Sequence, residues 1–179
     1  MSERFLIQKS DSRLEVRTGT EGLLSGWAHE HLIRAKDFEG FIDFSKSEPH
    51  KSRVSMSLLT QGLELMDEKV KPKDRKEIMK NMRKILECTR FPSISYLSES
   101  VTPVADGLEL EGNLRIKGRS KLLRTFVSIE SDEDSLTATG NFSFLHSDFG
   151  MKPFRAALGA IKVANELSID FHVRAVRTK

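Results

Sequence analysis

The amino-acid sequence predicts a mainly β protein built from antiparallel strands, with one amphipathic helix. Apolar and polar residues alternate in several segments of the second half, most clearly in residues 108–117 and 165–176, which is the pattern of half-buried strands. Strands with one polar face are typical of antiparallel sheets, because parallel sheets are covered on both faces and read as unbroken apolar runs. The strands recur at roughly ten-residue spacing, which favours a sandwich or a closed barrel.

The first half of the chain predicts shorter strands separated by turn residues. We expect them at residues 5–7, 13–17, 27–34, 38–44 and 54–58. Met56 and Leu58 share one face of the last of these, because side chains two apart on a strand point the same way. Residues 45–52 contain Pro49 and several charged residues and therefore predict a turn.

After Leu65 the hydrophobic period changes from that of a strand to that of a helix. The apolar stripe consists of Ile78, Met79, Met82, Ile85 and Leu86. Its spacing of three and four predicts one amphipathic helix at residues 72–88. Pro72 suits the first helical position, and Pro92 favours an end before it. The apolar stripe of this helix is expected to form a lid over the interior or a plug.

Longer strands are predicted in the second half. They cover residues 93–101, 108–117, 121–130, 136–145 and 165–176. Gly118 is expected in a tight hairpin turn, where glycine adopts positive φ at little cost. Residues 131–134 predict an acidic hairpin tip, and residues 148–151 and 156–159 interrupt the pattern before the last strand.

Length and charge limit the possible classes of protein. The 179 residues suit a single domain over residues 1–179, and a formal net charge of +3 is too small to favour nucleic-acid binding. Residues 69–90 hold nine Lys or Arg against three acidic residues. This basic segment is interpreted first as a solvated helix face, with an anionic membrane surface or an acidic partner as the alternative.

The only cysteine, Cys88, excludes an internal disulfide. Because no motif accompanies it, we expect a small buried side chain. The first residues contain a short apolar run, unlike a secretory signal, so the chain as given is expected in the cytoplasm. If a signal was removed, the periplasm is the alternative.

The histidines are the strongest candidates for catalysis or metal binding. His29 and His31 would share one face of a strand and could ligate a metal together, with a third ligand from His146 or His172. Two histidines without a specified third ligand are weak evidence, and hydrogen bonding at a barrel rim is the favoured use. Residues 146–148 do not form a catalytic triad, because adjacent residues on a strand point to opposite faces.

Several motifs in the second half resemble those of one known family. Residues 89–96, followed by Ser98 and Val101, are similar to an FP-x-I-x-F-x-S segment, residues 110–118 to a G-x-L-x-I-x-G strand, and residues 147–151 to a D-F-G-I turn. These motifs occur in this order in the YceI-like family of lipid-binding proteins. The N-terminal half is divergent, since residues 27–33 keep one histidine of the D-x-x-H-S-x-V-x-F segment but neither its aspartate nor its serine.

The resemblance implies an extended eight-stranded antiparallel lipocalin-like barrel whose tunnel holds an isoprenoid or another amphiphilic chain. We expect no catalytic residue, no metal and no cofactor, and the resemblance implies a homodimer. The matching apolar positions implied as tunnel lining are Ile94, Tyr96, Leu114, Ile116, Phe142, Phe144, Phe171 and Val173. Alternation alone adds Met56, Leu58 and Phe126, and the rim candidates for a polar head group are His29, His31 and His146.

Three functions follow from these observations. The first is a non-enzymatic carrier of a hydrophobic small molecule such as an isoprenoid, a fatty amide or an acyl chain. The second is a metal-dependent barrel that uses His29 and His31. The third is a filled barrel that acts as an interaction module, with the basic helix as its contact surface.

Overall fold

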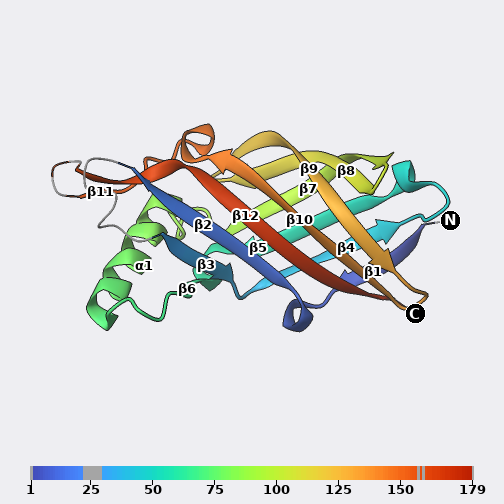
Figure 1. The fold of residues 1–179 in the computed structure, drawn as a ribbon, viewed down its shortest axis with the longest axis horizontal. Coiled ribbons are helices and arrows are strands. Elements are labelled where there is room, and N and C mark those ends of the chain that lie inside the picture. The colour runs from blue at the N-terminus through green and yellow to red at the C-terminus, as the bar shows by residue number, and fades with distance from the viewer. Residues whose placement is uncertain (1, 22–29, 157, 159, 179) are drawn as a thin grey trace.

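Eight antiparallel strands form a closed barrel. The computed structural model describes residues 2–21, 30–156, 158 and 160–178. In order around the barrel, the strands are β1 (Glu3–Ile7), β4 (Phe38–Phe44), β5 (Arg53–Leu59), β7 (Ser93–Val104), β8 (Gly107–Ile116), β9 (Arg119–Ser131), β10 (Ser135–Leu145) and β12 (Ile161–Arg177). β12 pairs with β1 and closes the ring (Figure 1). The predicted eight-stranded antiparallel barrel is confirmed.

Three of the barrel strands bend and continue beyond the ring. β2 (Arg13–Glu21) follows β1 in the chain, β3 (His31–Ala35) precedes β4, and β6 (Leu63–Leu65) follows β5. β2 pairs with β12, β3 with β2, and β6 with β3. A two-residue strand, β11 (Arg155–Ala156), pairs with the start of β12. One end of the barrel is therefore extended by β2, β3 and β6, which continue the same sheet.

The three bends lie next to one another and are tied by hydrogen bonds. The backbone N–H of Lys36 donates to the Gly62 carbonyl at 2.8 Å, and that of Leu59 donates to the Asp37 carbonyl at 2.9 Å. The Lys9 ammonium donates to the Asp37 carboxylate at 2.9 Å. These contacts hold the extension at a defined angle to the ring.

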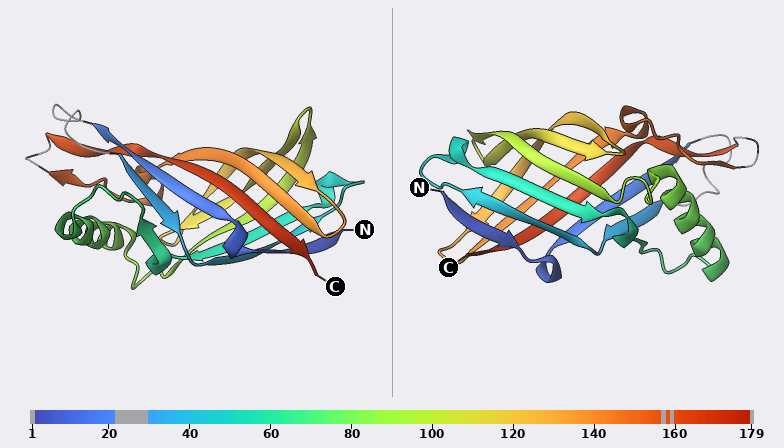
Figure 2. Two further views of the ribbon diagram at one scale, coloured as in Figure 1. Left: turned by 60° about the horizontal axis from the view of Figure 1, so that its bottom comes forward. Right: turned by 180° about the vertical axis from the view of Figure 1, so that it is seen from behind.

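Helix α1 (Pro72–Leu86) lies at the extended end, opposite the two chain termini (Figures 1 and 2). Pro72 occupies its first turn as predicted, but the helix ends at Leu86 instead of residue 88. Glu87 has φ 51°, a left-handed conformation, and its N–H donates to the Lys84 carbonyl. This conformation stops the helix, and Cys88 follows it as a buried side chain, as expected. None of the helices in the described part of the chain has the length and apolar character needed to span a bilayer.

The hairpins in the second half follow the predicted turn chemistry. Lys117 and Gly118 have φ 50° and 73° and join β8 to β9, which is the two-residue turn that favours glycine. Asp132 stabilises the turn between β9 and β10. Its carboxylate accepts hydrogen bonds from the backbone N–H groups of Asp134 and Ser135. These contacts hold the pKa of Asp132 below its ordinary value.

Inward-facing apolar residues form two clusters along the barrel. The terminal cluster lies at the end with the chain termini and consists of Phe5, Ile42, Val101, Leu108, Leu110, Val127, Leu136, Ala138, Val173 and Ala175. The helix-end cluster lies beneath α1 and consists of Ile33, Ala35, Phe38, Leu63, Leu65, Leu86, Cys88, Leu114, Ile116, Phe149 and Met151. Partly buried side chains connect the two clusters and surround the cavity described next.

Candidate functional site: an apolar tunnel inside the barrel

A cavity of about 520 Å³ runs inside the barrel. All eight strands of the ring contribute to its wall, together with β2, β3, β6, α1 and the segment before β12. Its size falls within the range of small-molecule sites. The barrel is therefore hollow, which the alternation of residues in the sequence left open.

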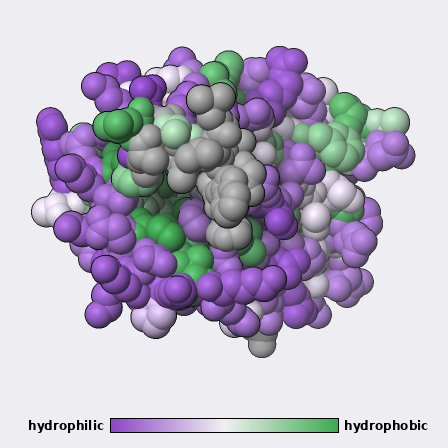
Figure 3. Space-filling model, turned by 60° about the vertical axis from the view of Figure 1, so that its left-hand side comes forward, coloured by the Kyte–Doolittle hydropathy of each residue, from purple (hydrophilic) through white to green (hydrophobic). Residues whose placement is uncertain are grey.

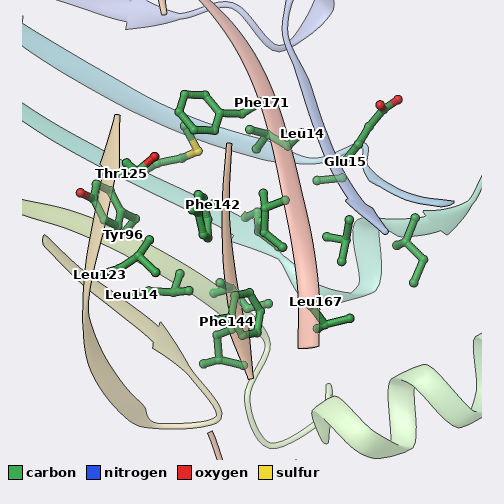
Figure 4. A pocket seen from close by; sticks show the side chains of 18 of the residues that line it. Leu14, Glu15, Tyr96, Leu114, Leu123, Thr125, Phe142, Phe144, Leu167 and Phe171 are labelled. Atoms are coloured by element: carbon green, nitrogen blue, oxygen red, sulfur yellow. The ribbon is translucent and has the colours of Figure 1, made fainter. Parts of the chain in front are cut away.

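Aromatic rings form much of the wall where β10 and β12 meet (Figure 4). The Phe142 ring lies 6.4 Å from Phe144 and 6.3 Å from Phe171, measured between ring centroids. Gly140 provides space for this group, because a Cβ atom there would lie 2.6 Å from the Phe171 ring. A glycine within the strand thus allows three aromatic side chains to face one cavity.

Ten of the predicted lining residues lie in the wall of this cavity. They are Met56, Leu58, Ile94, Tyr96, Leu114, Ile116, Phe142, Phe144, Phe171 and Val173. Leu114, Ile116 and Val173 are almost fully buried among their neighbours, whereas the other seven are partly exposed.

Phe126 does not line the tunnel, so that prediction is wrong. Its side chain is 49% exposed, while Thr125 and Val127 beside it are buried at 7% and 2% and lie in the wall. Leu122–Leu123 and Phe126–Val127 are adjacent apolar pairs in β9. Both faces of the strand therefore look apolar in sequence, and alternation alone cannot choose between them.

Sequence reasoning did not assign several wall residues to the tunnel. They are Leu14, Val16, Leu123, Leu167 and Ile169 from strands, and Ile78, Met82 and Ile85 from α1. Except for Leu123, whose neighbour Leu122 is also apolar, the strand residues carried the same alternation as the assigned ones. The helix residues carried a clear stripe, and their place in the wall means that α1 covers the interior as a lid.

Two of the three rim candidates are described, and both line the helix end of the tunnel. The His31 Nδ1 atom lies 3.7 Å from the Asp67 carboxylate. The His146 Nδ1 atom lies 3.1 Å from the Asn165 carbonyl, and since a carbonyl only accepts, Nδ1 carries the proton. Burial lowers the pKa of His146, which keeps its imidazole neutral. His29 lies outside the described residues.

The described residues supply no further ligand for the alternative metal site at His29 and His31. Within the described ranges, no three His, Cys, Asp or Glu side chains are grouped as a metal would require. His172 lies on the outer face, where its Nδ1 atom is 3.0 Å from the Thr139 hydroxyl. It therefore does not join His31 or His146 at the tunnel.

Charged groups in the described wall are few. Glu15 is the only Asp or Glu among the described lining residues, and these residues include no Lys or Arg. The Glu15 carboxylate is neutralised by Arg34, whose two nitrogens lie 3.0 and 2.5 Å from one of its oxygens. The tunnel thus presents no unpaired cation to a ligand.

Two of the described apolar side chains in the segment from η5 (His146–Phe149) to β12 are exposed. Phe154 lines the tunnel and is 40% exposed, and Leu158 is fully exposed. Figure 3 views the molecule from the helix end and shows apolar residues within a ring of hydrophilic ones.

A closed antiparallel barrel around an apolar lumen defines a lipocalin-like barrel of the ligand-binding type. The model of the YceI-like domain matches residues 6–175. The chain therefore belongs to the YceI-like family, and the predicted resemblance is confirmed along nearly its whole length, including the divergent N-terminal half.

Solved structures share this fold at low sequence identity. The chain is similar to BcnA of Burkholderia cenocepacia, with a TM-score of 0.77, 16% identity, and coverage of 94% of this chain and 99% of that one. It is also similar to the YceI protein of Campylobacter jejuni, with a TM-score of 0.64, 12% identity, and coverage of 82% and 85%. A search of curated proteins finds no match.

Proposed function

We propose that the protein binds and carries a hydrophobic or amphiphilic small molecule inside the barrel, without catalysing a reaction. The observation that carries this proposal is the hollow apolar interior of about 520 Å³. An isoprenoid, a fatty amide or an acyl chain would each fit its chemistry. Family membership supports a binding role, because YceI-like barrels bind hydrophobic small molecules.

Burial of the apolar chain would supply most of the affinity. Each methylene transferred from water contributes ~0.8 kcal/mol, so a tail of about ten methylenes gains ~8 kcal/mol before ordering costs. This gain depends on the apolar area that is buried more than on directional contacts such as hydrogen bonds. The protein should therefore accept several tails of similar length and width.

Native mass spectrometry of the purified protein, followed by organic extraction, tests this proposal. A discrete adduct that is released as a hydrophobic compound is the expected result. A mass equal to that of the bare chain, together with no binding of added long-chain probes, would contradict it. The same spectrum counts the chains per particle and so tests the homodimer that the family resemblance implies.

The helix end also supports peripheral contact with an anionic membrane. Lys73, Lys76, Lys80 and Lys84 are exposed on α1, which lines the tunnel together with the exposed Phe154. Cations with nearby apolar side chains are complementary to an anionic bilayer surface. This contact would bring the tunnel mouth to the membrane from which a lipid enters.

Vesicle sedimentation tests the membrane contact. Binding to phosphatidylglycerol-containing vesicles should weaken as salt rises and should be lost in Lys76→Glu/Lys80→Glu. Lys46→Glu is the matched control, because Lys46 is exposed beyond β4, at the opposite end of the barrel. Equal loss in both variants, or binding that ignores salt, would argue against a contact located at α1.

A further inference from the structure

The hydroxyl of Tyr96, which lines the tunnel, is a buried polar atom and has no hydrogen-bond partner among the described residues. Its nearest cross-strand neighbours, Met56 and Leu114, are apolar. Buried hydroxyl groups in folded proteins are nearly always paired, because leaving one unpaired is costly. Because the Tyr96 side chain lines the cavity, its unpaired hydroxyl indicates a partner that the cavity receives.

Gly112 determines where this hydroxyl lies. A Cβ atom on Gly112 would be 2.6 Å from the Tyr96 oxygen, so the phenol ring occupies the space that the missing side chain leaves. Along β8, Gly112 stands between Leu110 of the terminal cluster and Leu114 of the helix-end cluster. The hydroxyl is thus at the middle of the tunnel, well inside the rim histidines.

The surroundings select the kind of group that can meet this hydroxyl. Burial raises the pKa of Tyr96 to about 12, with a smaller contribution from Glu111, so the phenol stays protonated and can donate. Thr125 lies two strands away in the same region of the wall (Figure 4), but its hydroxyl donates to the Asn141 carbonyl at 2.9 Å. The described wall holds no Lys or Arg to balance an anion. The complementary group is therefore neutral and accepts a hydrogen bond.

We propose that the ligand carries a neutral oxygen acceptor within its apolar part, such as the carbonyl of a ketone, ester or amide, and that this oxygen accepts a hydrogen bond from Tyr96. This inference rests on the proposed binding function and specifies the ligand class. A plain hydrocarbon tail would leave the hydroxyl unpaired. Tyr96 would thus determine specificity in a tunnel that otherwise selects by size.

A series of long-chain ketones that differ only in carbonyl position, compared with the alkane of equal length, provides the probes. Their affinities are measured by displacement of a fluorescent fatty probe. In the unaltered protein, we expect one carbonyl position to bind best. In Tyr96→Phe, which removes only the hydroxyl, the affinity of that ketone relative to the alkane should fall about tenfold.

Phe142→Leu is the matched control, because it reshapes the same wall and keeps the hydroxyl. It should change ketone and alkane affinities together and preserve the preferred carbonyl position. Tyr96 is the only tyrosine in the chain, so ¹³Cζ-tyrosine labelling yields a single NMR signal. That signal should shift with the preferred ketone and stay near its alkane-bound position with the other probes.

The outcomes separate this inference from the proposed function. If neither ketones nor alkane bind, the carrier function itself is wrong. If all probes bind without a preferred carbonyl position, or if Tyr96→Phe leaves the ketone-to-alkane ratio unchanged, binding stands and the role of Tyr96 is overturned. An unchanged melting temperature in Tyr96→Phe shows that the variant folds.

Discussion

The terminal cluster and the tunnel wall are built from the same strands but differ in how completely their side chains pack. Leu136 and Ala175 are 0% exposed, and Phe5 is 2% exposed. None of the three is among the described wall residues. Phe142, Phe144 and Phe171, on the same strands β10 and β12, are only partly buried. At the terminal end, β1 closes the ring directly between β12 and β4, whereas at the other end the wall is extended by β2, β3 and β6 and covered by α1. Inward-facing residues therefore pack most completely where the ring is closed directly, and large partly buried side chains line the tunnel towards its extended end.

The largest expected effect comes from removing a packed side chain at the terminal end. Leu136→Ala should lower the free energy of unfolding by about 2–5 kcal/mol, because it leaves a void in a fully buried site. Leu58→Ala, in the tunnel wall, should cost under about 2 kcal/mol, since Leu58 already borders empty space. Denaturant unfolding of both variants measures the difference, and equal losses would contradict the distinction between the two regions.

Adding volume in the tunnel should impair ligand binding, whereas adding volume in the terminal cluster should impair stability. Met56→Trp should reduce the affinity for long-chain probes at least tenfold and change stability by within about 1 kcal/mol, because the cavity accepts the added volume. Leu136→Phe should cost about 1–3 kcal/mol by overpacking and leave probe binding intact. Probe titration and unfolding curves provide both measurements. A Met56→Trp variant that binds probes normally would show that ligands do not occupy this part of the barrel.

Tyr96 should make the protein less stable in alkali. Its folded-state pKa of about 12 lies above the unfolded value of 10, so the stabilising contribution is complete below pH 10 and is lost as pH rises towards 12. Tyrosinate absorbance should show one titration near 12 in the native protein. Tyr96→Phe should remove this part of the alkaline decline, and a native titration near 10 would mean that the phenol is solvated.

His146 should make the protein less stable in acid. Burial lowers its pKa in the folded protein below the ordinary value of 6.5. The unfolded chain therefore binds a proton first, and stability declines as pH falls below 6.5. His146→Asn should reduce this decline, whereas His50→Asn, at an exposed position, should keep it. Identical acid profiles for the two variants would place the cause elsewhere.

The smallest effect is expected on the outer face. Phe126→Ser should change the free energy of unfolding by within about 0.5 kcal/mol, because the ring is largely exposed, and it should leave probe affinity unchanged. Phe142→Ser, on the inner face of the neighbouring strand, should weaken both. Loss of probe binding in Phe126→Ser would contradict the assignment of strand faces in β9.

The strand register shows how far local sequence can predict the site. In β7, Ile94, Tyr96 and Ser98 face inward on even positions, but a register shift between Ser98 and Ser100 brings Val101 inward on an odd one. The predicted motif included Ser98 at an even position and Val101 at an odd one, and alternation did not explain the change. The bulge depends on pairing with β8, a strand beyond it in the chain, so local alternation could not reveal it.

The sequence by itself determined most of the strands, the helix and most of the residues that face inward, because these depend on local periodicity and turn chemistry. The closed barrel followed from the family resemblance, since periodicity alone also allowed a sandwich. The tertiary structure alone decided that the barrel is hollow, that Phe126 faces out, and that the Tyr96 hydroxyl lies over Gly112 without a partner. These features depend on how strands distant in the chain are spaced around the ring. Core side chains and tunnel-lining side chains follow the same alternation in sequence. Only the distance to the opposite wall of the barrel distinguishes one kind from the other.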